Sequence, residues 1–527
     1  MAVAVLSLRD NYWEEFELED EGITFLYEHL LEKEIPLTSE ELTPLLVEQR
    51  ISREKEALEK KRLDGKGIYK PKEEYEVRQG LIFPAMGWKK GEVTGIREGE
   101  NPELGEFKVI IIQFEEDLER EFASGIEHHI LNETIESAQA ESLDVGKVLL
   151  KNGDLLINRV EQGLRERPEF VCIAGRWFPR ALLLDVNIGH LNLAEAVLDM
   201  NDGGPLSTPD LIDQVGLSPD VHPTLVEFSM DLALQEDVRF DEVGPAGIVA
   251  WYLKAMEPDG VQEIPLYLQH IPIDCDRSSL TSQMLELERS LDDELSSFED
   301  YQLSPTDGVE ISLIFPHWRA GTLPLSEHIK PLFPTAYEAP RIRFTLIDGD
   351  TGERFSGWVV QEERYVYGLR DWYIAKGLIP GGVVRVKQGE NPGEVIVEAG
   401  ESRATKNWMR TVLVGSDGEL VFATLKQIVT AAYNERMAIA IPDIEPVDEI
   451  WRRNKKKPPP FEEIIVDTVR ELAKLNSQGH VHITELYAAV NMVRRCPPGP
   501  LMSLLETRPW FIHVGDLHFR FDDSQGK

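Results

Sequence analysis

The sequence predicts a multidomain α+β protein, in which repeated helical units that end in a β-hairpin occur together with two small β-barrel-like domains. Three observations lead to this prediction. The chain has 527 residues, which is enough for roughly three to five domains of ordinary size. Two stretches far apart in the chain align without gaps. Two other stretches consist of short β-type runs separated by Gly, Asn and Pro.

Composition and cysteine content limit the classes of protein to which this chain can belong. Hydrophobic residues make up 42% and charged residues 28%, which is typical of globular domains. No apolar run approaches the ~18 residues that a bilayer span needs, and the first residues lack the basic segment of a signal peptide. Cys172, Cys275 and Cys496 lie too far apart for a disulfide framework or a paired-cysteine metal site. We therefore expect a cytoplasmic protein without membrane contact.

The formal charge of −39 is distributed unevenly along the chain. Residues 341–527, called here the C-terminal third, hold 25 Lys and Arg against 26 Asp and Glu. Of the totals of 55 and 94, the other 340 residues therefore hold 30 basic and 68 acidic residues. The acidic part repels a phosphate backbone. We expect any nucleic-acid contact in the C-terminal third, and a protein partner, either a basic one or transcription machinery, on the acidic part.

The first 130 residues change from a helical to a β-type pattern. Residues 1–67 carry apolar side chains at helical spacing, such as Ile23 and Leu26, and are predicted to be helical, with a winged-helix unit as one candidate assignment. Residues 68–130 contain several short strand-like runs with turn residues between them. This pattern predicts a small β-barrel. The sequence does not indicate its ligand.

An internal repeat is the clearest sign of domain organisation. Residues 167–178 align without gaps on residues 508–519, and each segment follows an amphipathic helical stretch. In both, a proline ends the helix, and a strand, a turn and a second strand follow. A helix with such a hairpin is the second half of a winged-helix unit. The repeat therefore predicts winged helices at residues 131–189 and 458–527, with the four aligned phenylalanines inward: Phe170, Phe178, Phe511 and Phe519.

A third unit and an acidic segment follow the first hairpin. In residues 190–260, Ser207 and Thr208 begin a short helix, and a longer helix and two strands come after it, so a further winged helix is predicted. Residues 261–310 include the acidic stretch Glu286–Asp307. Such a charge run is typical of a solvated helix or linker.

Residues 311–400 form the second β-rich segment. Strands are predicted at residues 311–315, 322–325, 342–347, 355–360, 365–369, 383–387 and 394–398, and helices at residues 326–332 and 371–376. The segment resembles the DNA-binding pseudobarrel of plant transcription factors and of some restriction endonucleases. The resemblance is carried by Gly321–Leu325, Gly357–Val360, Gly368–Trp372 and Leu378–Gly382.

The pseudobarrel resemblance implies a site for duplex DNA. Trp318, Arg319 and Arg364 fall in the loops that form the two arms gripping the major groove in that family. An arginine there can pair with guanine through two hydrogen bonds. The alternative is that these are structural loops of a protein-binding barrel.

A dense basic run precedes the last winged helix. It lies at the end of a connecting segment, residues 401–457, and two further arginines lie just before the presumed recognition helix. One interpretation is an arm that contacts phosphates, because clustered cations release counterions from the duplex; the other is a solvated linker stiffened by the prolines that follow. The candidate phosphate contacts are Arg452, Arg453, Lys455, Lys456, Lys457, Arg494 and Arg495.

The chain lacks the common catalytic motifs. It has no phosphate-binding glycine loop, no paired-histidine zinc motif and no serine nucleophile elbow. The histidine pairs, such as His480 and His482, have no Cys or carboxylate at ligand spacing, so no metal site and no cofactor are expected.

The sequence thus favours a non-enzymatic, DNA-associated factor of transcription or genome defence. It would bind duplex DNA through its C-terminal third and protein partners through its acidic two thirds. Two alternatives stay open. One is an acidic scaffold whose winged helices bind only proteins, and the other is the specificity subunit of a restriction-type system.

Overall fold

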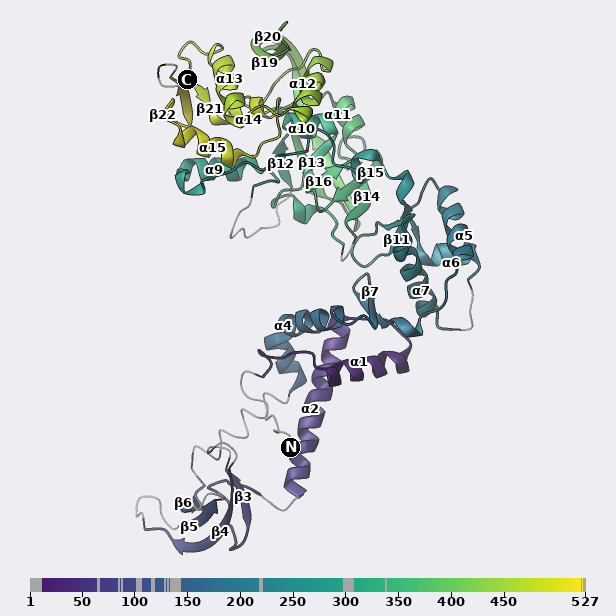
Figure 1. Cartoon of the computed structure of the whole chain (residues 1–527), viewed down its shortest axis with the longest axis vertical. Coiled ribbons are helices and arrows are strands. Elements are labelled where there is room, and N and C mark those ends of the chain that lie inside the picture. Colours follow the sequence, from purple (N-terminus) through teal and green to yellow (C-terminus); the bar gives the residue numbers. More distant parts are fainter. Residues whose placement is uncertain are drawn as a thin grey trace. The chain divides into compact units, whose positions relative to one another are not determined.

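The structure is a computed structural model with a mixed α+β architecture (Figure 1). It divides into two compact units, Met1–Asp185 with Asp220–Phe228, and Val186–Pro219 with Ser229–Lys527. Each is described by itself below. The structure describes residues 12–63, 67–83, 86, 89–100, 107–114, 119–127, 129, 132, 144–217, 221–296, 308–336, 339–522 and 524.

Three helices and a small sheet of the first compact unit make an N-terminal helix–hairpin unit. Its sheet has the order β1-β8-β7, and Leu37 of β1 pairs with Trp177 of β8. The predicted division into separate units at residues 1–67 and 131–189 is therefore wrong here, since both segments contribute to one sheet. The elements are α1 (Asp20–Lys33), β1 (Leu37–Thr38), α2 (Ser39–Leu63), α4 (Val145–Arg165), β7 (Phe170–Ile173) and β8 (Arg176–Pro179).

A five-stranded sheet is inserted in the sequence between α2 and α4. Its strands follow one another in chain order, and an aromatic cluster that includes Tyr69, Phe83 and Phe114 fills its core. The insertion explains why the two halves of the helix–hairpin unit lie so far apart in the sequence. The strands are β2 (Gly67–Ile68), β3 (Gly80–Phe83), β4 (Lys89–Glu98), β5 (Lys108–Phe114) and β6 (Glu119–Ser124).

A middle helix–hairpin unit repeats the same order of elements. Ser207 caps the short helix α6 by accepting a hydrogen bond from the backbone N–H of Asp210, as the sequence predicts. The sheet order is β9-β11-β10. The elements are α5 (Ile188–Asp199), β9 (Leu206–Ser207), α6 (Thr208–Val215), α7 (Pro223–Glu236), β10 (Phe240–Glu242) and β11 (Ala250–Leu253).

A C-terminal helix–hairpin unit is the third copy. Its sheet order, β21-β23-β22, places the first strand beside the last, as in the other two copies. The three segments therefore share both their element order and their strand order. The elements are α13 (Phe461–Ala473), β21 (Val481–His482), α14 (Ile483–Val490), α15 (Pro498–Thr507), β22 (Phe511–Gly515) and β23 (His518–Phe521).

The hairpins predicted from the repeat are present in both aligned segments. Ala174 and Gly175 form one two-residue turn, and Asp516 and Leu517 the other, all four with positive φ. Such turns match the twist of the flanking strands. The four aligned phenylalanines are buried, which confirms the predicted inward orientation: Phe170, Phe178, Phe511 and Phe519.

A curled seven-stranded sheet forms the middle of the second compact unit. Its order is β12-β17-β18-β14-β15-β16-β13, with β14 parallel to β18 and the other pairs antiparallel. The strands predicted between residues 342 and 398 are confirmed within two residues at each end. The strands are β12 (Val309–Ser312), β13 (Thr322–Pro324), β14 (Arg341–Asp348), β15 (Arg354–Val360), β16 (Tyr365–Tyr367), β17 (Val383–Gln388) and β18 (Glu394–Ala399).

Short helices connect these strands. The predicted helix at residues 326–332 is only a 3₁₀ turn, whereas the one at residues 371–376 is confirmed as α11. Residues 315–320 form a helix, where the sequence predicts a loop. These and the remaining short helices are α8 (Asp259–Gln262), α9 (Ser282–Leu291), α10 (Phe315–Ala320), α11 (Arg370–Lys376), η2 (Arg180–Leu182), η3 (Lys254–Met256), η4 (Arg277–Ser279) and η5 (Lys330–Leu332).

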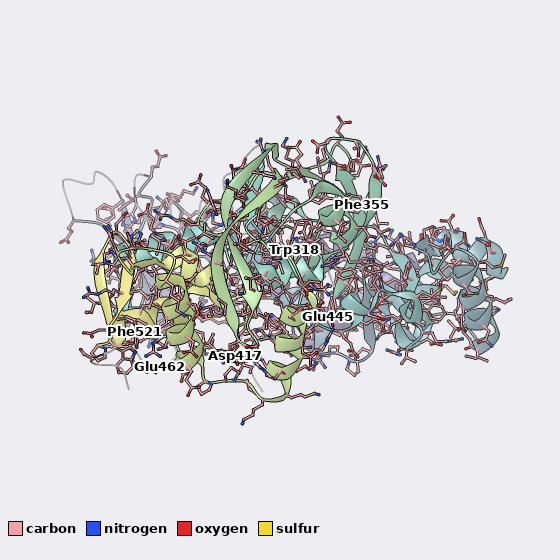
Figure 2. All side chains as sticks on the ribbon, turned by 90° about the horizontal axis from the view of Figure 1, so that it is seen from above. Trp318, Phe355, Asp417, Glu445, Glu462 and Phe521 are labelled. Atoms are coloured by element: carbon pink, nitrogen blue, oxygen red, sulfur yellow. The ribbon has the colours of Figure 1, made fainter. Side chains whose placement is uncertain are left out.

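The predicted connecting segment 401–457 instead forms a long β-ribbon and a helix. Strands β19 (Glu401–Val414) and β20 (Leu420–Ala431) pair along their length, and α12 (Glu445–Lys456) follows. Val412 and Phe422 of the ribbon are buried in one core with Trp451 of α12 and with the C-terminal helix–hairpin unit. Figure 2 labels Asp417 in the turn of the ribbon and Glu445 at the start of α12.

Candidate functional site

The basic end of α12 is the candidate site that stays on the surface. Val447, Ile450 and Trp451 bury one side of this helix, and the indole Nε1 of Trp451 donates to the carbonyl of Met492 at 2.8 Å. This anchoring turns the opposite side of the helix to solvent. The exposed cations there and just after the helix are Arg452, Arg453, Lys455, Lys456 and Lys457, called here the α12 basic end.

Two of these cations already have acidic neighbours. Arg452 pairs with Glu445 at 2.9 Å and Glu449 at 3.1 Å, and Arg453 pairs with Glu419 at 3.2 Å. Both arginine side chains are about half exposed. An exposed ion pair is worth only about 0–1 kcal/mol. A phosphate group can therefore displace these carboxylates at little cost.

The three lysines of the α12 basic end, Lys455, Lys456 and Lys457, are exposed, and no salt bridge to them is found within the described part of the chain. A hollow of about 490 Å³ lies beside them, lined by Lys456, Lys457, Arg453 and the ribbon residues Val414 and Gly418. Cations in the last turn also offset the negative end of the helix dipole. The wall of this hollow thus presents several exposed cations to an anion, with Glu449 as a carboxylate on the same wall.

Trp318 and Arg319 do not lie in a free loop. They belong to α10, where the indole of Trp318 donates to the carbonyl of Leu378 at 2.7 Å. The guanidinium of Arg319 donates to both carboxylate oxygens of Asp448, at 3.0 and 2.7 Å, and lies 5.3 Å from the ring centroid of Tyr267. The predicted base contact by these two residues is corrected, because intramolecular partners occupy both side chains.

Arg364 is exposed and has a positive φ of 55° in the turn between β15 and β16. One of its guanidinium nitrogens donates to the backbone carbonyl of Glu294 at 3.2 Å. Arg364, Glu362 and Glu363 together line a hollow of about 520 Å³. The structure therefore places Arg364 beside two carboxylates.

Arg494 and Arg495 are both buried, Arg494 partly and Arg495 completely. Arg494 is about half-buried, stacked 5.6 Å from the ring centroid of Phe461, and burial lowers the pKa of its guanidinium. The side chain of Arg495 is 0% exposed. A fully buried guanidinium cannot reach a DNA phosphate, so the prediction that Arg495 contacts DNA is wrong.

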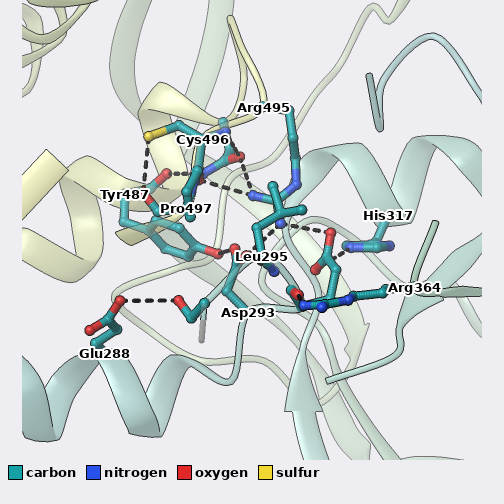
Figure 3. A network of polar contacts seen from close by, with 12 residues as sticks. Glu288, Asp293, Leu295, His317, Arg364, Tyr487, Arg495, Cys496 and Pro497 are labelled. Atoms are coloured by element: carbon teal, nitrogen blue, oxygen red, sulfur yellow. Dashed lines mark hydrogen bonds and ion pairs between the residues drawn. The ribbon is translucent and has the colours of Figure 1, made fainter. Parts of the chain in front are cut away.

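Arg495 is instead the centre of a buried polar network (Figure 3). Its guanidinium pairs with Asp293 and with Glu294, each at 2.7 Å. The Tyr487 hydroxyl donates to Asp293 at 2.5 Å, and an imidazole nitrogen of His317 lies 3.1 Å from Glu294. The network connects the C-terminal helix–hairpin unit with α10 and with the segment after α9.

The charges in this network favour the anionic form of Glu294. Burial by itself raises the pKa of Glu294, but the charges of Arg495 and His317 outweigh burial and hold that pKa below its ordinary value. Burial lowers the pKa of Arg495, and Asp293 and Glu294 outweigh this and raise it. Within the acidic stretch, α9 is the expected helix and Glu286 is exposed, but the expectation of solvation is wrong for three acidic residues. These residues, Glu288, Asp293 and Glu294, are buried against cationic partners.

Sequence reasoning missed this network because its parts lie about 200 residues apart. The hydrogen bonds of Arg495 to Asp293 and Glu294 span 202 and 201 residues. No local spacing connects them. The available signal was a double arginine between two helices that contain neither Lys nor Arg.

Comparisons with family models, with curated proteins and with solved structures find no match to this chain. Among the described residues, none of the helices is both long and apolar enough to cross a bilayer. Nor do three or more His, Cys, Asp or Glu side chains gather to hold a metal ion in that part of the chain.

Proposed function

We propose that this protein is a non-enzymatic, DNA-associated factor of transcription or genome defence. In this proposal the α12 basic end contacts the phosphates of duplex DNA, and the acidic two thirds of the chain engages protein partners. The observation that carries the proposal is the set of five exposed cations on and just after one helix turn, within a region of nearly balanced charge.

The physical basis of the proposed contact is counterion release. Each phosphate that a lysine or arginine neutralises frees condensed cations from the duplex, which makes binding favourable and strongly dependent on salt. Contacts of this kind carry no sequence information. We therefore assign the α12 basic end to positioning of the protein on DNA rather than to reading of bases.

The three helix–hairpin units support a winged-helix assignment. Each has the order helix, strand, helix, helix, strand, strand, with the first strand beside the last. In a DNA-reading winged helix the third helix enters the major groove. However, α7 and α15, the third helices of the middle and C-terminal units, contain neither Lys nor Arg and are largely buried. The proposal therefore does not place DNA on these helices.

The curled seven-stranded sheet is compatible with the pseudobarrel resemblance. Its strand and helix order between β14 and β18 follows the order that the sequence predicts. Arg319 is held by Asp448, so the groove-reading role of its arm is left out of the proposal. Arg364 stays a proposed contact, and its guanidinium would first have to leave the Glu294 carbonyl.

The proposal is tested with the full chain, because Leu280 and Met284 of the α9 region share a core with the C-terminal helix–hairpin unit. A fragment that starts at residue 311 would lack these residues and the anionic partners of Arg495. The measurement is duplex affinity as a function of salt. The variant is Lys455→Gln/Lys456→Gln/Lys457→Gln, and the matched control is Arg470→Gln/Lys474→Gln/Arg520→Gln, which removes the same charge from exposed positions on or just after α13 and on β23.

We expect the α12 variant to reduce the salt slope by about 0.9 for each phosphate that the protein no longer neutralises, equally on every duplex sequence. The control should change the slope much less. Equal reductions in the two variants would mean that only net charge matters, and the proposal would be abandoned. The same holds if the native chain does not bind duplex DNA at about 50 mM salt, where non-specific contacts are still strong.

A second candidate is the acidic scaffold that binds only proteins. It is favoured by the burial of α7 and α15 and by the absence of cations on both helices. A winged-helix fold does not by itself imply DNA binding, so the same units can serve as protein contacts. A native chain without duplex affinity would favour this candidate over the first.

A further inference from the structure

The β-ribbon exposes an unusual aromatic surface. Trp408 on β19 is 68% exposed, while every other tryptophan that the structure describes is buried or half-buried. Ile428 on the neighbouring strand is 60% exposed. A large exposed indole costs free energy in water, because its apolar area stays hydrated. Such a surface is often a binding site.

The register of the ribbon places two lysines beside this indole. Trp408 pairs with Lys426, and Lys406 pairs with Ile428, so all four side chains lie on one face of the ribbon. The Nζ atom of Lys426 lies 5.1 Å from the ring centroid of Trp408. Both lysines are exposed. We call these four residues the ribbon face.

A polar cavity adjoins the ribbon face. It has a volume of about 810 Å³, and Trp408 forms part of its wall together with Asn407, Arg410, Tyr433 and His480. The Asn407 amide donates to the Tyr433 hydroxyl at 3.3 Å. Two carboxylates, Glu435 and Glu485, also line the cavity.

Arg410 is the one Lys or Arg among the described residues that line this cavity. It pairs with Glu485 at 2.7 Å, which neutralises that carboxylate. Its Nε atom is buried, and no hydrogen-bond partner is found for it among the described residues. The cavity wall thus combines an aromatic face, amide and hydroxyl groups and an incompletely satisfied cation.

We propose that the ribbon face and its cavity bind single-stranded nucleic acid. One base stacks on Trp408, the ammonium groups of Lys406 and Lys426 contact the adjoining phosphates, and the edge of a neighbouring base meets Asn407 and Tyr433. Aromatic stacking with flanking cations is how single strands are held without sequence preference. Stacking on a side chain requires an unpaired base, so duplex DNA does not fulfil this role.

Charge decides between nucleic acid and an apolar protein partner. An apolar surface placed on Trp408 would strip water from two neighbouring ammonium groups and return nothing for it. Phosphates compensate for this loss of hydration, because they form ion pairs with the two ammonium groups. The inference concerns a different surface from the α12 basic end and does not depend on the duplex proposal.

The test uses the full chain and an oligothymidylate of about 12 nucleotides, a length within the usual range for one site, that carries one 2-aminopurine. Stacking of this base on an indole quenches its fluorescence, while anisotropy of an end label measures affinity. The test variant is Trp408→Ala. The matched control is Leu413→Ala, which alters an exposed apolar residue on the opposite face of the same ribbon.

We expect the native chain to bind and quench the probe, and Trp408→Ala to weaken binding by about tenfold or more and to abolish the quenching. Trp408→Phe should retain part of both signals, and Leu413→Ala should behave like the native chain. Because Trp408 is exposed, its replacement leaves no internal cavity, and circular dichroism checks that each variant is folded.

Three results would overturn the inference: no probe binding by the native chain, binding without quenching, or equal effects of Trp408→Ala and Leu413→Ala. The lysine variant of α12 separates this inference from the proposed function. If that variant loses duplex affinity while Trp408→Ala loses only single-strand affinity, both sites stand. Absence of one activity in the native chain removes only the corresponding site.

Discussion

Two clusters of basic residues in the C-terminal third, the α12 basic end and the pair Arg494–Arg495, both contain a double arginine but lie in opposite environments. The α12 basic end is exposed, and its ion pairs are on the surface. Arg495 is buried and paired with Asp293 and Glu294 (Figure 3). The sequence predicts DNA contact for both clusters.

This difference indicates that burial, more than charge, decides whether an arginine binds an external phosphate or stabilises the fold. A buried charge has lost its hydration and must be paired where it lies, so breaking that pair is costly. An exposed charge keeps its hydration and exchanges partners at little cost. Variants in the two clusters should therefore change different properties of the protein.

The largest effect is expected from Arg495→Met. This change leaves Asp293 and Glu294 buried without their cation, and it should lower the free energy of unfolding by about 3–5 kcal/mol. Urea unfolding followed by tryptophan fluorescence measures the change. A decrease below about 1 kcal/mol would show that the network does not stabilise this part of the fold.

Neutralising the partners of Arg495 sharpens this prediction. Combining Arg495→Met with Asp293→Asn and Glu294→Gln removes the unpaired charges together with the cation. Most of the stability should return, because uncompensated charge rather than poorer packing causes the damage. If the triple variant is less stable than the single one, the explanation by unpaired charge fails.

A smaller effect is expected from Arg319→Met. It removes two hydrogen bonds to Asp448, which is almost fully buried and also accepts from the Tyr267 hydroxyl. We expect a decrease of about 1–3 kcal/mol in the free energy of unfolding. The preference among duplex sequences should stay unchanged, as competition binding can measure. A relaxed sequence preference would restore the base-reading role of this residue.

A pH effect is expected from His482, which lies at the start of α14. Burial, reinforced by the nearby charge of Arg436, lowers the pKa of His482 to about 4 from an ordinary value of 6.5. Between these values the unfolded chain binds a proton that the folded chain does not. Stability should therefore fall as the pH falls from about 6.5 to about 4, by at most about 1.4 kcal/mol per unit for one proton.

The control for this pH effect is His482→Asn. Asparagine can still accept the cap hydrogen bond that His482 accepts from the Thr484 N–H, but it does not titrate. Thermal unfolding of the variant should depend less on pH over this range than that of the native chain. Identical pH profiles would mean that other groups cause the acid sensitivity.

The smallest effect on stability is expected from the triple change of Lys455, Lys456 and Lys457 to Gln. These side chains are exposed, so the free energy of unfolding should change by less than about 1 kcal/mol. The same variant is the one expected to lose duplex affinity. A large decrease in stability would contradict the contrast between the two clusters.

The sequence alone determined much of the local structure. The repeat predicted two hairpins with buried phenylalanines, and the short β-type runs between residues 342 and 398 predicted strands that the structure confirms. Ser207 marked the start of α6. These features depend on residues close in the chain, where spacing and turn chemistry are readable.

Only the tertiary structure decided which segments meet and which charges are buried. Leu37 pairs with Trp177, although the five-stranded sheet lies between them in the sequence, and Asp293 pairs with Arg495 about 200 residues away. The ribbon of β19 and β20 likewise brings Trp408 and Lys426 together on one face. Contacts of this kind depend on how whole elements pack. A local pattern of charge is the same whether its side chains face water or a buried partner.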